Sequence, residues 1–131
     1  MTSFSFGKDE KLCSQKLIGE LFLSGNTFLC YPLKVVWKVE LVEMPHPAQV
    51  VFSVPKRLFK RAHDRNLLKR QMRETYRFRK HELYELLASN DKKIVFMLVY
   101  IAKEKVEFKQ LETAINKVIG KFGRNLTEKS E

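Results

Sequence analysis

The most constraining feature of this chain is an apolar run from Ile94 to Ala102, flanked by lysines in KKIVFMLVYIAK. The run is of strand length and is far too short to span a bilayer. A strand without polar alternation is typical of the centre of a sheet that is covered on both faces. The sequence therefore predicts a small layered fold with packing elements on each side of this strand.

Hydrophobic spacing predicts three helices and two or three further strands around it. Apolar residues recur at helical spacing from Asp9 to Leu23, with Asp9 placed as the cap and Gly25 just past the end. Alternation from Leu33 to Leu41 predicts a half-buried strand, and Pro32 indicates an edge or bulge at its start. The later elements are a loop at 43–48 that joins two antiparallel strands, a strand at 49–54, a long helix at 62–87 with a candidate break at 79–82, and a helix from 108 to about 123.

This order predicts an α+β fold, with one small mixed sheet packed with helices in the order α-β-β-(β)-α-β-α. The segment from Gln49 to Ala102 fits a parallel crossover, for which right-handedness is the general expectation. We expect one domain over residues 1–131, ordered from about 5 to 122, with a flexible polar tail at 123–131. With no leader sequence and only two isolated cysteines, Cys13 and Cys30, the chain is expected to be a soluble cytoplasmic protein with free thiols.

Nearly the whole net charge of +10 lies in one segment, from Lys56 to Lys80. The segment contains eleven of the twenty-five Lys and Arg residues against two acids, and so carries +9. Solvated charge runs normally interleave Glu with Lys, yet Glu74 is the only acid from Arg65 to Lys80. Such uncompensated repulsion favours binding to an external polyanion, and the excess of Arg over Lys on the helix suits phosphate contacts.

Helical spacing divides this segment into two neighbouring faces. The packing face contains Leu68, Met72, Tyr76 and Leu83. The basic face contains Asn66, Lys69, Arg70, Arg73 and Arg77. The sequence therefore predicts a helix that is anchored along one side and presents cations along the next.

Residues that could carry out chemistry are sparse. His46, His63 and His81 are scattered and match no zinc-ligand spacing, and the five glycines form neither a Walker loop nor a dinucleotide fingerprint. No nucleophile elbow is present. We expect the chain alone to be non-catalytic and to hold no cofactor of its own.

The stretch SVPKRLFKRAHDRNLLKRQMRE, from Ser53 to Glu74, resembles the signature region of the bacterial ribonuclease P protein subunit. The family motif places an Arg-Asn pair before a Lys-Arg pair on a long helix, and the order of elements over about residues 5–122 is also similar. The residues that match the motif are Arg65, Asn66, Lys69, Arg70 and Arg73. Leu67 departs from the usual Arg-Asn-Arg triplet.

This resemblance implies the accessory subunit of a ribonucleoprotein endonuclease that removes the 5′ leader from precursor tRNA. Catalysis would belong to the RNA subunit and its Mg²⁺ ions, and the partners would be the catalytic RNA and precursor tRNA, with no membrane or DNA. A left-handed crossover is also implied. The residues implied to hold RNA are those of the motif, together with Lys56, Arg57, Lys60 and Arg61 ahead of it. Arg77 completes this set from the basic face.

The resemblance also implies a second site, a cleft between the first helix and the sheet that receives the single-stranded leader. Phe22 keeps a place where the family often has an aromatic residue for stacking on bases. Ile18 and Val36 stand at other such places, and ordinary core packing is the alternative for both. The candidate backbone contacts are Lys11, Lys34 and Lys38.

Two other functions stay open at this point. One is a non-catalytic ribosomal or RNA-assembly module that uses the same helix without a leader cleft. The other is a self-sufficient nuclease, which the lack of paired carboxylates or clustered histidines disfavours.

Overall fold

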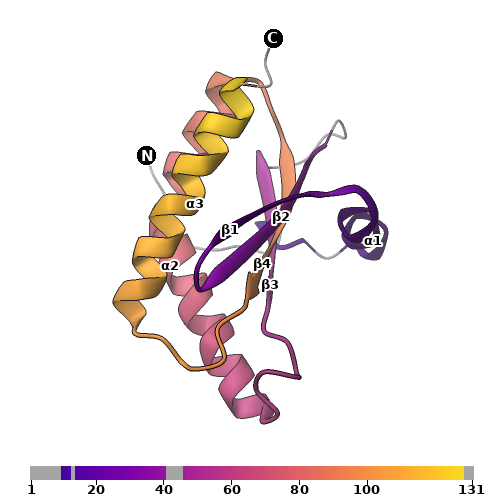
Figure 1. Cartoon of the computed structure of the whole chain (residues 1–131). Helices are drawn as coiled ribbons and strands as arrows, with labels where there is room; N and C mark the ends of the chain where they lie inside the picture. Colours follow the sequence, from indigo (N-terminus) through magenta and orange to yellow (C-terminus); the bar gives the residue numbers. More distant parts are fainter. Residues whose placement is uncertain (1–9, 13, 41–45, 129–131) are drawn as a thin grey trace.

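The structure is a computed structural model that describes residues 10–12, 14–40 and 46–128, and these residues form three helices and four strands, arranged as in Figure 1. The elements in chain order are α1 (Gln15–Ser24), β1 (Asn26–Cys30), β2 (Leu33–Val39), β3 (Ala48–Ser53), α2 (Ala62–Ser89), β4 (Ile94–Tyr100) and α3 (Phe108–Glu128). The fold is therefore α+β with a mixed sheet, as the sequence predicts.

The four strands lie in the order β1-β2-β4-β3. β2 is antiparallel to both β1 and β4, whereas β3 is parallel to β4. The central position of β4 confirms the prediction from its apolar run. β2 and β3 run in opposite directions but are not neighbours, because β4 lies between them. A strand in the interior of a sheet is covered on both faces. β4 is the most apolar of the strands, so it gains more from this position than β2 or β3, which include polar residues.

The helices form a layer on each face of the sheet. α2 and α3 cover one face and α1 covers the other (Figure 1). In the larger core, the Phe122 ring of α3 meets Trp37 and Phe96 edge-on, with ring centroids 5.6 and 5.2 Å apart. In the smaller core, Leu21 of α1 packs with Val36 and with side chains of β4. Each core thus depends on alternate residues of the same central strand.

α2 connects β3 to the parallel strand β4, so the predicted parallel crossover is confirmed. The candidate break at Arg79 to Glu82 is wrong, because the helix runs through it without interruption. Lys80 and Leu83 are both buried there, so packing continues on one side of the helix through the whole polar stretch. The left hand of the crossover stays a prediction.

Two predicted boundaries are wrong, and each error has a local cause. α1 begins at Gln15 because Ser14 caps it, its Oγ accepting a hydrogen bond from the Leu17 N–H at 3.3 Å. Asp9 lies outside the described residues. β1 is a separate strand between α1 and β2, where the sequence left the number of strands open. α3 continues past Gly123, which has no positive φ and lies against Leu86 inside the helix. The predicted flexibility of the tail is not tested, and of the predicted loop at 43–48 only residues 46–48 are described.

Candidate nucleic-acid interface

The packing face of α2 sets the direction of its basic face. Leu68 and Met72 are fully buried, and Tyr76 is nearly so. Because neighbouring arcs of a helix differ by a fixed rotation, burial of this arc aims the next one away from the sheet. Both faces predicted from helical spacing are therefore present.

Most of the predicted RNA-binding side chains are accessible. Lys56, Arg57, Lys60 and Arg61 are exposed in the turn before α2. On the helix, Asn66 and Arg70 are exposed, and Lys69, Arg73 and Arg77 are half-buried. Among the described residues, no hydrogen bond or ion pair is made by the side chains of Lys56, Arg57, Lys60, Arg61, Lys69, Arg70 or Arg73. These cations form a surface whose charge is uncompensated within the described part of the chain.

The two acids of this segment do not neutralise that surface, since each is already paired. Asp64 accepts a hydrogen bond from the Lys105 Nζ at 2.7 Å, and this bond holds the pKa of the Asp64 carboxyl below its usual range. Glu74 binds the Nη2 of Arg77 at 2.7 Å. The guanidinium of Arg77 also lies over the Phe78 ring, 4.6 Å from its centroid. Arg77 is therefore the cation of the basic face that is partly neutralised.

Arg65 has a structural role that sequence reasoning missed. Its Nη1 donates to the carbonyl oxygens of Phe59 and Lys60, at 2.8 and 2.9 Å. These bonds fasten the preceding turn to the first turn of α2, whose cap residue Arg61 makes no side-chain capping bond. A guanidinium has five N–H donors, so Arg65 keeps donors for RNA while it holds the turn.

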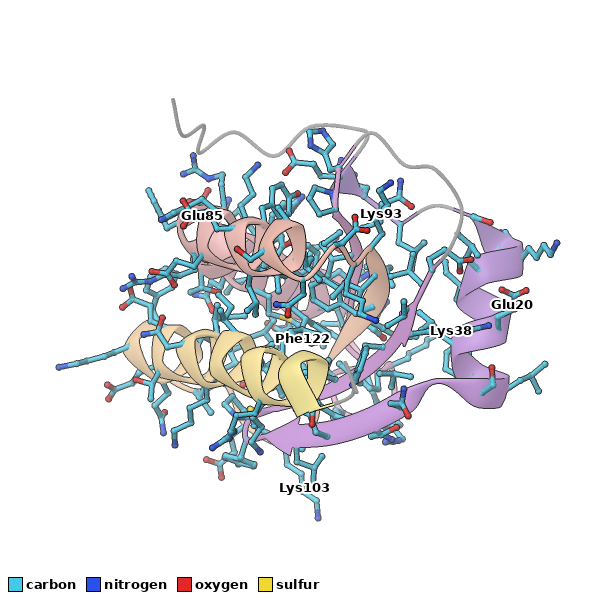
Figure 2. The ribbon with its side chains drawn as sticks, turned by 90° about the horizontal axis from the view of Figure 1, so that it is seen from above. Glu20, Lys38, Glu85, Lys93, Lys103 and Phe122 are labelled. Carbon is cyan, nitrogen blue, oxygen red and sulfur yellow. The ribbon has the colours of Figure 1, made fainter. Side chains whose placement is uncertain are left out.

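The predicted leader-cleft residues other than Lys11 lie on α1 or on the face of β2 that α1 covers, but they differ in exposure. Phe22 is 71% exposed on α1, whereas Val36 is buried beneath α1 and Ile18 packs against the same small core. The Lys38 Nζ lies 3.8 Å from the Glu20 carboxylate, and Figure 2 shows the two side chains pointing toward each other. Lys34 is half-buried on β2. Core packing, the alternative reading, thus describes Ile18 and Val36 in this structure, and their contact with a leader stays a prediction.

Lys11 lies apart from these residues. It forms an isolated parallel bridge with Val50 on the outer edge of β3, near Lys69 and Arg73 of α2. The sequence placed it in the first helix, and the structure places it before that helix. Only tertiary pairing with β3 decides this position.

A buried polar cluster was also missed. Glu10 and Lys80 are each 4% exposed and form an ion pair, and the Tyr84 hydroxyl donates to the same carboxylate. Burial raises the pKa of Tyr84 far above its ordinary value, as it does for the neighbouring Tyr76. In helical spacing, Lys80 falls on the same arc of α2 as the buried apolar residues. A buried lysine needs an acidic partner, so this position was a signal in the sequence for a buried ion pair.

The described residues contain neither a membrane-spanning helix nor a metal-binding cluster. No helix in the described part of the chain is long and apolar enough to cross a membrane. No group of three or more His, Cys, Asp or Glu side chains is placed to hold a metal ion within residues 10–12, 14–40 and 46–128.

A mixed sheet with a helical crossover that carries uncompensated cations is the architecture of a small polyanion-binding protein. The sequence profile of the family described as Ribonuclease P matches residues 6–123. The chain is 30% identical over 124 residues to the ribonuclease P protein component of Porphyromonas gingivalis, covering 95% of this chain and 90% of that protein. It belongs to the ribonuclease P protein family, whose members are subunits of the holoenzyme for tRNA 5′ processing.

Solved structures of the family share this fold. A mutant RNase P protein of Staphylococcus aureus superposes with a TM-score of 0.70 at 18% identity, covering 88% of this chain and 89% of that chain. The RNase P protein of Thermotoga maritima has a TM-score of 0.68 at 18% identity, with coverage of 86% and 96%. At these identities the likeness concerns the fold alone.

Proposed function

We propose that this protein holds the catalytic RNA of ribonuclease P through the basic face of α2 and the turn before it. In this proposal the RNA subunit and its Mg²⁺ ions carry out cleavage, the protein alone does not cleave RNA, and the complex acts in the cytoplasm. The observation that carries the proposal is the set of exposed and half-buried cations that have no partner within the described residues. A phosphate backbone supplies the missing negative charge.

The same electrostatics suggest how the protein assists the reaction. Catalytic RNA and precursor tRNA repel each other, and either Mg²⁺ or basic side chains can screen that repulsion. The protein should therefore matter most when Mg²⁺ is scarce. Its binding should also weaken steeply as monovalent salt rises, because each neutralised phosphate releases counterions.

We further propose that the α1 side of the sheet receives the 5′ leader of precursor tRNA. The exposed ring of Phe22 supports this, since a ring with most of its surface in solvent is free to stack on an unpaired base. Lys34 lies on the sheet face that α1 covers, where it is placed for backbone contact.

The proposal is tested by adding purified protein to ribonuclease P RNA at low Mg²⁺ and measuring cleavage of precursor tRNA. We expect stimulation by the wild-type chain and a large loss of stimulation when Lys69, Arg70 and Arg73 are replaced together by Ala. Arg65 is left unchanged because it holds the turn. The matched control replaces three exposed lysines elsewhere, Lys103, Lys109 and Lys117, and removes the same charge.

Three results would contradict the proposal. One is no stimulation by the wild-type protein, and another is equal loss in the two triple variants. The third is recovery of ribosomal RNA, without ribonuclease P RNA or precursor tRNA, when the protein is crosslinked in cell extract. That last result would support the ribosomal or assembly-module alternative.

A further inference from the structure

Residues 10–12 extend the open edge of the sheet. Lys11 pairs with Val50 of β3, and the Leu12 N–H donates to the Val50 carbonyl at 2.9 Å. β3 is the last strand on its side of the sheet, so this short segment lies beside it on the side of α2 that bears Lys69 and Arg73. The chain thereby brings a third cation to that part of the fold.

The residues on both sides of Lys11 are anchored. Glu10 is buried against Lys80 and Tyr84 of α2, while Leu12 is buried in the small core beneath α1. Lys11 itself is exposed. A side chain between two anchored neighbours has a fixed base and a free end, which suits a binding contact.

A groove of about 280 Å³ opens at this place. It is lined by Lys11, Leu12, Val50, Val51, Phe52, Lys69 and Arg73. Leu12 and the edge of β3 supply its apolar part, here called the floor, and Lys11, Lys69 and Arg73 supply its charged part. Within the described part of the chain, none of these three cations donates a side-chain hydrogen bond or forms an ion pair.

We propose that this groove binds one nucleotide of a single-stranded RNA segment, with its phosphate among Lys11, Lys69 and Arg73. The base or ribose then lies against the apolar floor at the edge of β3. A free phosphate ion would not use this floor, and an apolar ligand would not use three unpaired cations. The volume of about 280 Å³ lies just below the roughly 300–1,000 Å³ range of pockets for drug-sized ligands, which suits a single nucleotide. Duplex RNA, read through its backbone, would leave the floor empty.

This inference rests on the proposed function and makes it more specific. It transfers Lys11 from the leader cleft to the site on α2. The basic face then has a defined end, where RNA backbone contacts on α2 meet a pocket for an unpaired nucleotide. The segment that supplies this nucleotide comes either from the catalytic RNA or from precursor tRNA.

A double-substitution cycle tests the shared phosphate. We expect Lys11→Ala and Lys69→Ala each to weaken binding to ribonuclease P RNA or its complex with precursor tRNA by roughly tenfold. The double variant should lose less than the product of the two effects, since both cations contact one phosphate. Lys103→Ala is the matched control, because Lys103 points away from the fold in Figure 2 and should leave affinity unchanged.

The outcomes separate this inference from the proposed function. If wild-type protein binds neither RNA, the proposed function fails. If wild-type protein binds but Lys11→Ala behaves like Lys103→Ala, or the two effects multiply, the nucleotide pocket alone is refuted. Circular dichroism of each variant verifies that the fold is intact.

A photo-crosslinking side chain in place of Lys11 distinguishes the two sources of RNA. The holoenzyme is irradiated once without and once with precursor tRNA, and the crosslinked nucleotide is mapped. Attachment to an unpaired nucleotide of either RNA supports the pocket and identifies its occupant. Attachment only to base-paired nucleotides, or no attachment when the same side chain at Lys69 does crosslink, overturns it.

Discussion

Removing the carboxylate of Glu10 should destabilise the protein far more than removing a surface acid. The Glu10 and Lys80 side chains are each only 5% exposed, so Glu10→Gln leaves a lysine charge buried beside a neutral group. Loss of one partner from a buried ion pair typically costs about 3–5 kcal/mol. That is a large share of the roughly 5–15 kcal/mol that stabilises an ordinary domain.

A competing process sets an upper limit on this loss. Residues 10–12 are held by a short bridge to β3, so they can detach and let water reach Lys80. The measured loss of stability is then the smaller of two free energies: the free energy of this local opening and the cost of the buried, unpaired charge. The opening would expose the Leu12 N–H, which otherwise donates to Val50.

Two measurements together separate these possibilities. Urea unfolding followed by circular dichroism gives the free energy of unfolding, and hydrogen exchange of the Leu12 amide gives the local opening. We expect Glu10→Gln to lower at least one of them by several kcal/mol. Adding Lys80→Met should recover part of the loss, because it removes the unpaired charge.

The control is Glu82→Gln, which breaks the ion pair with Arg79. That pair is 3.5 Å long, its two side chains are 44% exposed, and exposed pairs contribute at most about 1 kcal/mol. The reasoning is refuted if Glu10→Gln costs no more than Glu82→Gln while the Leu12 amide stays as protected as in the wild-type protein.

Three further predictions concern pH and the leader. Burial raises the pKa of Tyr76 above its ordinary 10.0, because the buried phenol is more stable in its neutral form. The contribution of Tyr76 to the free energy of unfolding is therefore complete below about pH 10 and is lost at higher pH, where the unfolded chain loses this proton first. Tyr76→Phe should flatten the fall in unfolding free energy between about pH 9 and pH 11. The Lys105 bond lowers the pKa of Asp64 from 3.8. The ionised Asp64 side chain therefore stabilises the fold above about pH 3.8, and this stabilisation is lost as the pH falls further. Asp64→Asn should flatten the fall in unfolding free energy, measured with urea, at acid pH. Phe22→Ala should weaken binding of the single-stranded leader several-fold. The Leu23→Ala control should not, although Leu23 is 89% exposed, and equal effects would argue against stacking.

Much of the fold was predictable because its elements have strong local patterns. The apolar run of β4 required cover on both faces, and the helical spacing of Leu68, Met72 and Tyr76 identified the buried side of α2. Local spacing reports which side of an element is buried, since it follows directly from helix and strand geometry. The family motif lies on this same helix, so its residues could also be found from the sequence.

The amino-acid sequence therefore predicts the type of each main element, the buried side of α2, and the cations beside it. Which strands are neighbours, that Arg65 holds a turn, and that Lys11 and Lys69 line one groove at the edge of β3 follow only from the packing of the whole chain. The difference lies in the range of the interactions. Periodicity records contacts within a few residues, whereas strand order and the pairing of Glu10 with Lys80 depend on groups brought together by the packing of the whole chain.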